Sequence, residues 1–171
     1  MSITKPEASE FGSYYDQYVA QVQGDDIVSI LKAQADSASD LLASISEEQS
    51  THRYAPGKWS IRELAGHLID TERVFTYRAF RFSRNDETPL HGYDHDKYIE
   101  VANYDARFLR DIAGELSTVR AATLAFFSGL SDEMMLSHGV ANNNPFSVRA
   151  MAWIIAGHTE HHLSVLKEIY L

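Results

Sequence analysis

The 171-residue chain has no cysteine, only four prolines and nine glycines, and no apolar run that approaches the roughly 18 residues of a membrane span. The absence of cysteine excludes protein thiolates as metal ligands or nucleophiles, and it fits a reducing compartment. The polar residues 1–12 contain no apolar core of a secretion signal. We therefore expect a cytoplasmic protein without a membrane partner, in which any thiol chemistry needs a thiol from outside the chain.

Basic residues are also scarce. The chain carries 15 Lys and Arg against 24 Asp and Glu, which gives a formal net charge of −9. Because affinity for a phosphate backbone comes from Lys and Arg, this balance opposes nucleic-acid binding. The sequence shows neither a basic stripe nor a nucleic-acid motif, so we expect no nucleic-acid partner.

Apolar residues recur with the period of helices rather than strands. The hydrophobic content of 44% is enough for one domain over residues 1–171, with 1–24 as an N-terminal extension that holds a short helix and 26–171 as the core. No segment alternates over five or more residues, so we predict no sheet. The pattern predicts an all-α four-helix bundle with short additional helices, and the loops around the third long helix leave its connectivity open.

The few glycines, prolines and capping residues mark the ends of these helices. Long helices are expected at about 26–45, 60–83, 105–128 and 147–170, with short ones near 13–23, 95–102 and 131–136. The second long helix opens with a capping box, in which Ser60 caps and Glu63 reaches back. The segment 146–149 (FSVR) resembles 59–62 (WSIR), which indicates either an internal repeat or shared capping chemistry.

Three histidines face the predicted core. His158 and His162 are four residues apart on the apolar stripe of the last helix, so they project from one face. His67 has the inward phase of its own helix, whereas His161 falls on a polar flank and is expected at the edge of the site. One inward histidine is more often a hydrogen-bonded core residue than a ligand, but three in one small helical domain favour a metal site. Three nitrogens and an open position suit zinc, nickel or iron(II).

Carboxylates next to these histidines are the candidate catalytic groups. Asp70 is expected to orient the ring of His67 or to act as a fourth ligand, a role that His161 could also take. Glu160, and Glu63 as a further candidate, are expected to accept a proton beside the metal or to support a ligand.

Several other residues have weaker predicted roles. Gly157 is costly inside a helix, so we expect another helix to approach closely there. Arg78 could face inward, toward Asp70 or a substrate carboxylate. Residues 92–96 form a loop that could line the mouth of the pocket. The remaining histidines are expected at the surface: His52, His91, His95 and His138.

Two motifs resemble the DinB-like / YfiT-like family of metal-dependent enzymes. The first is Pro56-Gly57-Lys58-Trp59-Ser60-Ile61-Arg62-Glu63-Leu64 with His67, Asp70 and Glu72-Arg73 after it. The second is Phe146-Ser147-Val148-Arg149, which leads to His158 and His162. The resemblance spans about five-sixths of the chain, from Ile27 onward.

This resemblance implies a four-helix bundle, a divalent metal held by His67, His158 and His162, and a homodimer. Relatives include S-transferases that use bacillithiol or mycothiol, maleylpyruvate isomerases, and proteins assigned only as hydrolases. Some ergothioneine-type relatives carry Glu or Gln two residues after the last ligand, where this chain has Ser164, which weakens that interpretation. Apolar residues near the N-terminus are candidates for the dimer face: Phe11, Tyr14, Tyr15 and Tyr18.

We therefore expect an enzyme that acts on a small-molecule substrate. Its three-histidine metal would activate water, as in a hydrolase, or a low-molecular-weight thiol, as in an S-transferase. The alternative is a helical module that binds a metal or a small ligand, for sensing or in stress, without turnover.

Overall fold

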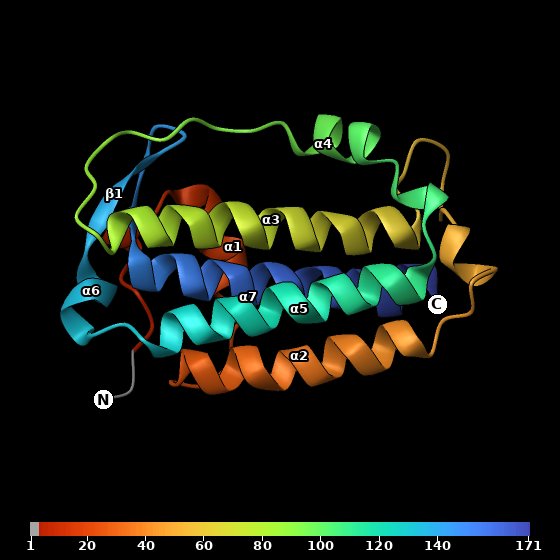
Figure 1. Ribbon diagram of the computed structural model, residues 1–171, viewed down its shortest axis with the longest axis horizontal. Helices are drawn as coiled ribbons and strands as arrows, with labels where there is room; N and C mark the ends of the chain where they lie inside the picture. Colours follow the sequence, from red (N-terminus) through yellow and green to blue (C-terminus); the bar gives the residue numbers. More distant parts are fainter. Residues whose placement is uncertain (1–3) are drawn as a thin grey trace.

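The computed structural model describes residues 4–171 and consists mainly of four long helices (Figure 1). The helices are α1 (Asp16–Val19), α2 (Ile27–Ala43), α3 (Ile61–Phe82), α4 (His95–Ala102), α5 (Leu109–Ser128), α6 (Asp132–Leu136) and α7 (Val148–Val165). Two strands, β1 (His138–Ala141) and β2 (Asn144–Ser147), precede α7, and a π-helical turn, Leu166–Tyr170, follows it. The predicted all-α bundle is confirmed. In this part of the chain no helix is long and apolar enough to cross a membrane.

The long helices are not arranged in simple chain order. Both α2 and α3 pack against α5 and against α7, so α2 and α3 lie across the bundle from each other. The segment that carries α4 returns along α3, and α5 therefore starts at the same end as α3 (Figure 1). Glu47 stabilises this end, because its carboxylate pairs with Arg62 of α3 and accepts the backbone N–H groups of Leu109 and Arg110.

The two similar helix openings use the same local chemistry. Ser60 and Ser147 each cap their helix by accepting the backbone N–H three residues on. Ser60 belongs to the predicted capping box, and both of its reciprocal hydrogen bonds are present. An arginine of each helix pairs with a glutamate of an earlier segment: Arg62 with Glu47, and Arg149 with Glu10.

A buried ion pair connects all four long helices. Arg120 of α5 makes hydrogen bonds of 2.8–3.1 Å to the carboxylate of Glu72 on α3. It also donates to the backbone oxygen of Leu31 on α2 and to the hydroxyl of Thr159 on α7. Because each guanidinium nitrogen has an acceptor and the charge faces a carboxylate, the charge is buried without being left unpaired.

The prediction of no sheet is wrong, because β1 and β2 form an antiparallel hairpin. Asn142 and Asn143 connect the strands with φ values of 48° and 61°. Positive φ at both central residues is what a two-residue type I′ loop requires, and asparagine tolerates it better than most residues. The four-residue strands are shorter than the five-residue alternation on which the prediction relied.

The bounds of two helices and the exposure of the expected dimer face also differ from the predictions. The helix expected at 13–23 is shorter, with a 3₁₀ turn at Ser13–Tyr15 and then α1. The helix α5 begins four residues later than expected, and Phe108, which lies inside the expected range 105–128, precedes its first turn and is 53% exposed. Of the four apolar residues proposed for a dimer face, Phe11 and Tyr18 are buried, and only Tyr14 is largely exposed.

Candidate metal centre

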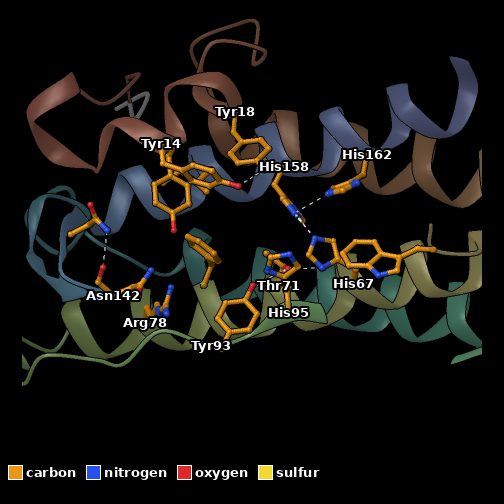
Figure 2. A pocket seen from close by; sticks show the side chains of 15 residues that line it. Tyr14, Tyr18, His67, Thr71, Arg78, Tyr93, His95, Asn142, His158 and His162 are labelled. Carbon is orange, nitrogen blue, oxygen red and sulfur yellow. Dashed lines mark hydrogen bonds between the residues drawn. The ribbon is translucent and has the colours of Figure 1, made fainter. Parts of the chain in front are cut away.

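Two helices bring the three predicted histidines together. His67 comes from α3, and His158 and His162 come from α7 (Figure 2). The Nε2 atom of His158 lies 2.9 Å from Nε2 of His67 and 3.1 Å from Nε2 of His162. One ligand atom from each ring falls within 4.8 Å of the others. The helical phase of all three residues is therefore as predicted.

The environment keeps these rings neutral. Burial, followed by repulsion from neighbouring histidines, lowers the pKa of His67 to about 2 and that of His162 to about 3. The same causes hold the pKa of His158 well below its usual range. Neutral imidazole is the form that ligates a metal, because one ring nitrogen then has a free lone pair.

Hydrogen bonds among the three rings alone cannot account for these short distances between Nε2 atoms. Nε2 of His158 faces two other Nε2 atoms, but a neutral ring nitrogen either donates one proton or offers one lone pair. A divalent cation would take one lone pair from each ring. Metal–nitrogen bonds of about 2.0–2.1 Å in tetrahedral geometry separate the nitrogens by about 3.3 Å. The distances of 2.9 and 3.1 Å that involve His158 are within a few tenths of an ångström of that value, and all three ligand atoms lie within 4.8 Å of one another, so the three residues fit such an ion.

The side chain that contacts the outer nitrogen of His67 is Thr71, not Asp70. The Thr71 hydroxyl lies 3.5 Å from Nδ1 of His67 and 3.0 Å from the hydroxyl of Tyr93. Asp70 instead accepts a hydrogen bond from the Tyr104 hydroxyl at 3.0 Å. Burial raises the pKa of Asp70, although that hydrogen bond opposes the rise.

The histidines lie in the wall of a cavity of about 450 Å³. Besides the three histidines, the lining consists of Tyr14, Tyr15, Tyr18, Trp59, Thr71, Phe75, Arg78, Tyr93, His95, Asn142, Asn144 and Ile154. Over residues 4–171 this lining includes no carboxylate. Glu160, expected to act here, accepts a hydrogen bond from Gln34 at 3.2 Å instead, and Glu63 is used in the capping box of α3.

Sequence reasoning missed several lining residues. His95 was expected at the surface, and although it is exposed, its ring centroid lies 5.5 Å from that of His67. Asn142 and Asn144 reach the cavity from a hairpin that was not predicted. Of residues 92–96, expected as a loop that could line the mouth, Tyr93 and His95 belong to the lining, although His95 is already the first residue of α4.

The close approach predicted at Gly157 is confirmed. A Cβ atom at this position would lie 2.0 Å from the backbone oxygen of Tyr18. The absence of a side chain therefore lets α1 rest directly on α7 beside the histidines. This contact places Tyr18 with its ring 5.4 Å from that of His158, edge to face.

Comparison with known proteins identifies similar sequences and folds. The family model described as the DinB superfamily matches residues 30–166. A curated protein of Oceanobacillus iheyensis with the name "Putative metal-dependent hydrolase" is 25% identical over 126 residues, which cover 72% of each chain.

Two solved structures share the fold. YfiT from Bacillus subtilis, described as "a probable metal-dependent hydrolase with an unusual four-helix bundle topology", superimposes with a TM-score of 0.71 and 17% identity, over 96% of this chain and 90% of that one. The mycothiol-dependent maleylpyruvate isomerase superimposes with a TM-score of 0.68 and 10% identity. That match covers 84% of this chain but only 62% of the isomerase.

Proposed function

Because this chain belongs to the DinB superfamily, a family with metal-dependent enzymes, we propose that it is itself a metal-dependent enzyme acting on a small molecule. His67, His158 and His162 would hold a divalent cation, for which zinc, nickel and iron(II) all suit three imidazoles. The proposal rests on one observation above all, the convergence of three neutral ring nitrogens at the wall of an open cavity.

The number of protein ligands favours catalysis over a purely structural metal. Structural zinc sites are closed by four protein ligands, whereas catalytic sites keep a position for water or substrate. Within the part of the chain that the structure describes, the only cluster of candidate metal ligands has three members: His67, His158 and His162. A cation held there would keep a coordination position that no protein ligand fills. The cavity of about 450 Å³ beside them has room for a small substrate.

A bound divalent cation would supply Lewis acidity, which lowers the pKa of a coordinated water or thiol or polarises a carbonyl group. The chain's own residues would do the rest. Thr71 lies between the ring of His67 and the hydroxyl of Tyr93, so it connects the ligand to the cavity wall. Trp59, whose ring centroid is 4.6 Å from that of His67, shields one side of the centre from water.

Proton transfer needs a group other than the predicted carboxylates. Asp70 and Glu160 make their hydrogen bonds to Tyr104 and Gln34, and neither lines the described cavity. His95 does line it, beside His67. We propose that His95 accepts the proton when water is the nucleophile, because histidine is the commonest general base. A thiol that enters the cavity already ionised, as thiolate, would need no such base.

The printed names of the relatives include both routes. The names of the Oceanobacillus and Bacillus proteins point to hydrolysis, and the mycothiol-dependent isomerase points to a low-molecular-weight thiol. The structural likenesses below 25% identity support the fold alone. The choice between water and thiol therefore depends on an activity measurement.

The test combines metal content with turnover. Purified protein should hold close to one divalent cation per chain by elemental analysis, and the His158→Ala variant should hold far less. Chelated protein, reloaded with zinc, nickel or iron(II), is then assayed on a panel of esters and amides, and on low-molecular-weight thiols with a generic electrophile. Metal-dependent turnover lost in His158→Ala supports the proposal. A bound metal without turnover on any substrate indicates a binding module, and unchanged metal in His158→Ala contradicts the site itself.

A further inference from the structure

The cavity has a second charged feature at its other end. Arg78 of α3 lines this end and is only 3% exposed. One of its guanidinium nitrogens donates to the backbone oxygen of His91 at 2.9 Å. Its guanidinium carbon lies 5.3 Å from the ring centre of Phe75 and 5.7 Å from that of Tyr93. Arg78 is therefore held between two rings, with one backbone acceptor.

Arg78 differs from the other buried arginines in having no anionic partner. Arg120 is paired with Glu72, and Arg62 with Glu47. Arg78 forms no ion pair with any carboxylate in residues 4–171. Buried arginines are rare unless paired, and burial lowers the pKa of Arg78 without a carboxylate to oppose it. A guanidinium with free donors facing a cavity is suited to an anion that enters from solvent.

The positions on α3 relate this arginine to the histidines. Arg78 follows His67 by eleven residues, which is about three helical turns, so both lie on the same face, about 16 Å apart along the axis. Side chains in a helix lean toward its N-terminus, so the guanidinium leans toward His67. Thr71 and Phe75 lie between them and also line the cavity.

The neighbours at this end are neutral hydrogen-bonding groups. Figure 2 shows Arg78 and Asn142 at one end of the cavity and the three histidines at the other. Asn142 and Asn144 come from the hairpin, and Tyr14 and Tyr93 present hydroxyl groups. The described lining thus offers a positive charge and neutral polar groups, with no negative charge to repel an anion.

We infer that Arg78 binds an anionic group, a carboxylate or a phosphate, of an elongated small molecule whose other end reaches the three histidines. The inference deepens the proposed function. The claim that the other end of the molecule reaches the histidines rests on the proposed metal centre, whereas the anion site at Arg78 does not. Arg78 is a specificity-determining residue in this scheme, because its planar fork can hold both oxygens of a carboxylate or phosphate. The rival role is structural, in which Arg78 only secures the loop through the His91 oxygen.

The first experiment uses metal-free protein, so that it does not depend on the proposed metal. Binding of hexanoate and of hexyl phosphate is measured by NMR titration for the wild type, Arg78→Gln and Arg78→Lys. We expect Arg78→Gln to weaken binding at least tenfold and Arg78→Lys to weaken it less, since lysine keeps the charge but not the fork. The probe that binds with the higher affinity identifies the preferred anion as carboxylate or phosphate. The matched control is Arg81→Gln, an outer α3 position paired with Asp86, which should leave binding unchanged.

The second experiment uses zinc-loaded protein and alkyl hydroxamates of increasing chain length, ending in either a carboxylate or its methyl ester. The hydroxamate group chelates the metal, so the ester series reports on the metal centre alone. We expect the carboxylate to improve affinity at least tenfold over the ester at one chain length, and Arg78→Gln to remove that gain while ester binding stays the same.

The two proposals fail in different ways. Failure of the esters to bind would count against the proposed metal centre, while the NMR titration would still test Arg78. Equal affinity of wild type and Arg78→Gln for hexanoate and hexyl phosphate, with matching thermal unfolding, would overturn the anion site. Weaker binding that accompanies a loss of the cavity's NMR signals in both arginine variants would assign Arg78 the structural role instead.

Discussion

At the scale of single residues, position on the helix separates the three clustered histidines from a fourth one beside them. His161 and His162 are adjacent in α7, but a step of one residue turns the side chain by about 100°. His162 joins the cluster, whereas His161 stays outside it, with its ring 5.6 Å from that of Tyr18.

This difference leads to a prediction about metal binding. His162→Ala should lose most of the bound metal, because it removes one of three ligands. His161→Ala should keep close to one metal per chain, because it removes only an edge contact. Elemental analysis of both purified variants, alongside wild type, measures the effect. Equal metal loss in the two variants would contradict the assignment of the ligands.

The sequence predicted the histidines but not their polar neighbours. The phase of a helix is local, so the inward direction of His67, His158 and His162 follows from the apolar stripes. The partners of Asp70 and Glu160 are set by tertiary contacts instead. Their hydrogen-bond partners are 34 and 126 residues away in the chain, and nothing in the local pattern identifies them.

At the scale of elements, the contact of α1 with α7 depends on one missing side chain. Gly157 lies in the middle of α7, where glycine costs roughly 1 kcal/mol compared with alanine. Its backbone supports the Tyr18 turn of α1, which carries one wall of the cavity.

We predict that Gly157→Ala displaces α1 despite its better helix propensity. The new Cβ would meet the backbone oxygen of Tyr18 at 2.0 Å, and backbone cannot move aside as a flexible side chain can. The variant should unfold at lower urea concentration, and amide exchange should rise over α1. Gly114→Ala on α5 is the matched control, because nothing lies within 4 Å of its added Cβ, and it should be stabilised by about 0.4–1 kcal/mol. Destabilisation of both variants to the same degree would refute the steric explanation.

Element positions were more predictable than element ends or short strands. The capping box at Ser60 placed the start of α3 to the residue, because the cap is a local hydrogen-bond pattern. The start of α5 was predicted too early because Tyr104–Ala106 form a separate 3₁₀ turn before Leu109, the first residue of α5. The hairpin was not predicted because its strands pair with each other over only four residues each.

At the scale of the whole molecule, the pair of Arg120 and Glu72 fixes how the four long helices fit together. Both side chains are almost fully buried, and other packings of the same helices would leave the guanidinium without its acceptors.

Glu72→Gln should therefore destabilise the protein by about 3–5 kcal/mol, since it leaves a buried charge without its counterion. Chemical denaturation in urea, followed by circular dichroism, measures this loss. Glu115→Gln is the control, because Glu115 pairs with the more exposed Arg73 and Arg107, and exposed pairs contribute about 1 kcal/mol or less. Similar losses in both variants would mean that the buried pair has no special role.

The walls of the cavity come from two stretches of the chain, one inside the family match and one before it. All three histidines fall within residues 30–166, the stretch shared with the superfamily, whereas Tyr14, Tyr15 and Tyr18 precede it. The three histidines and Arg78 thus lie in the matched stretch, while one wall of the same cavity comes from the residues before it. Substitutions at Tyr14, Tyr15 and Tyr18 would therefore reshape the space beside the histidines without altering any of the three imidazoles.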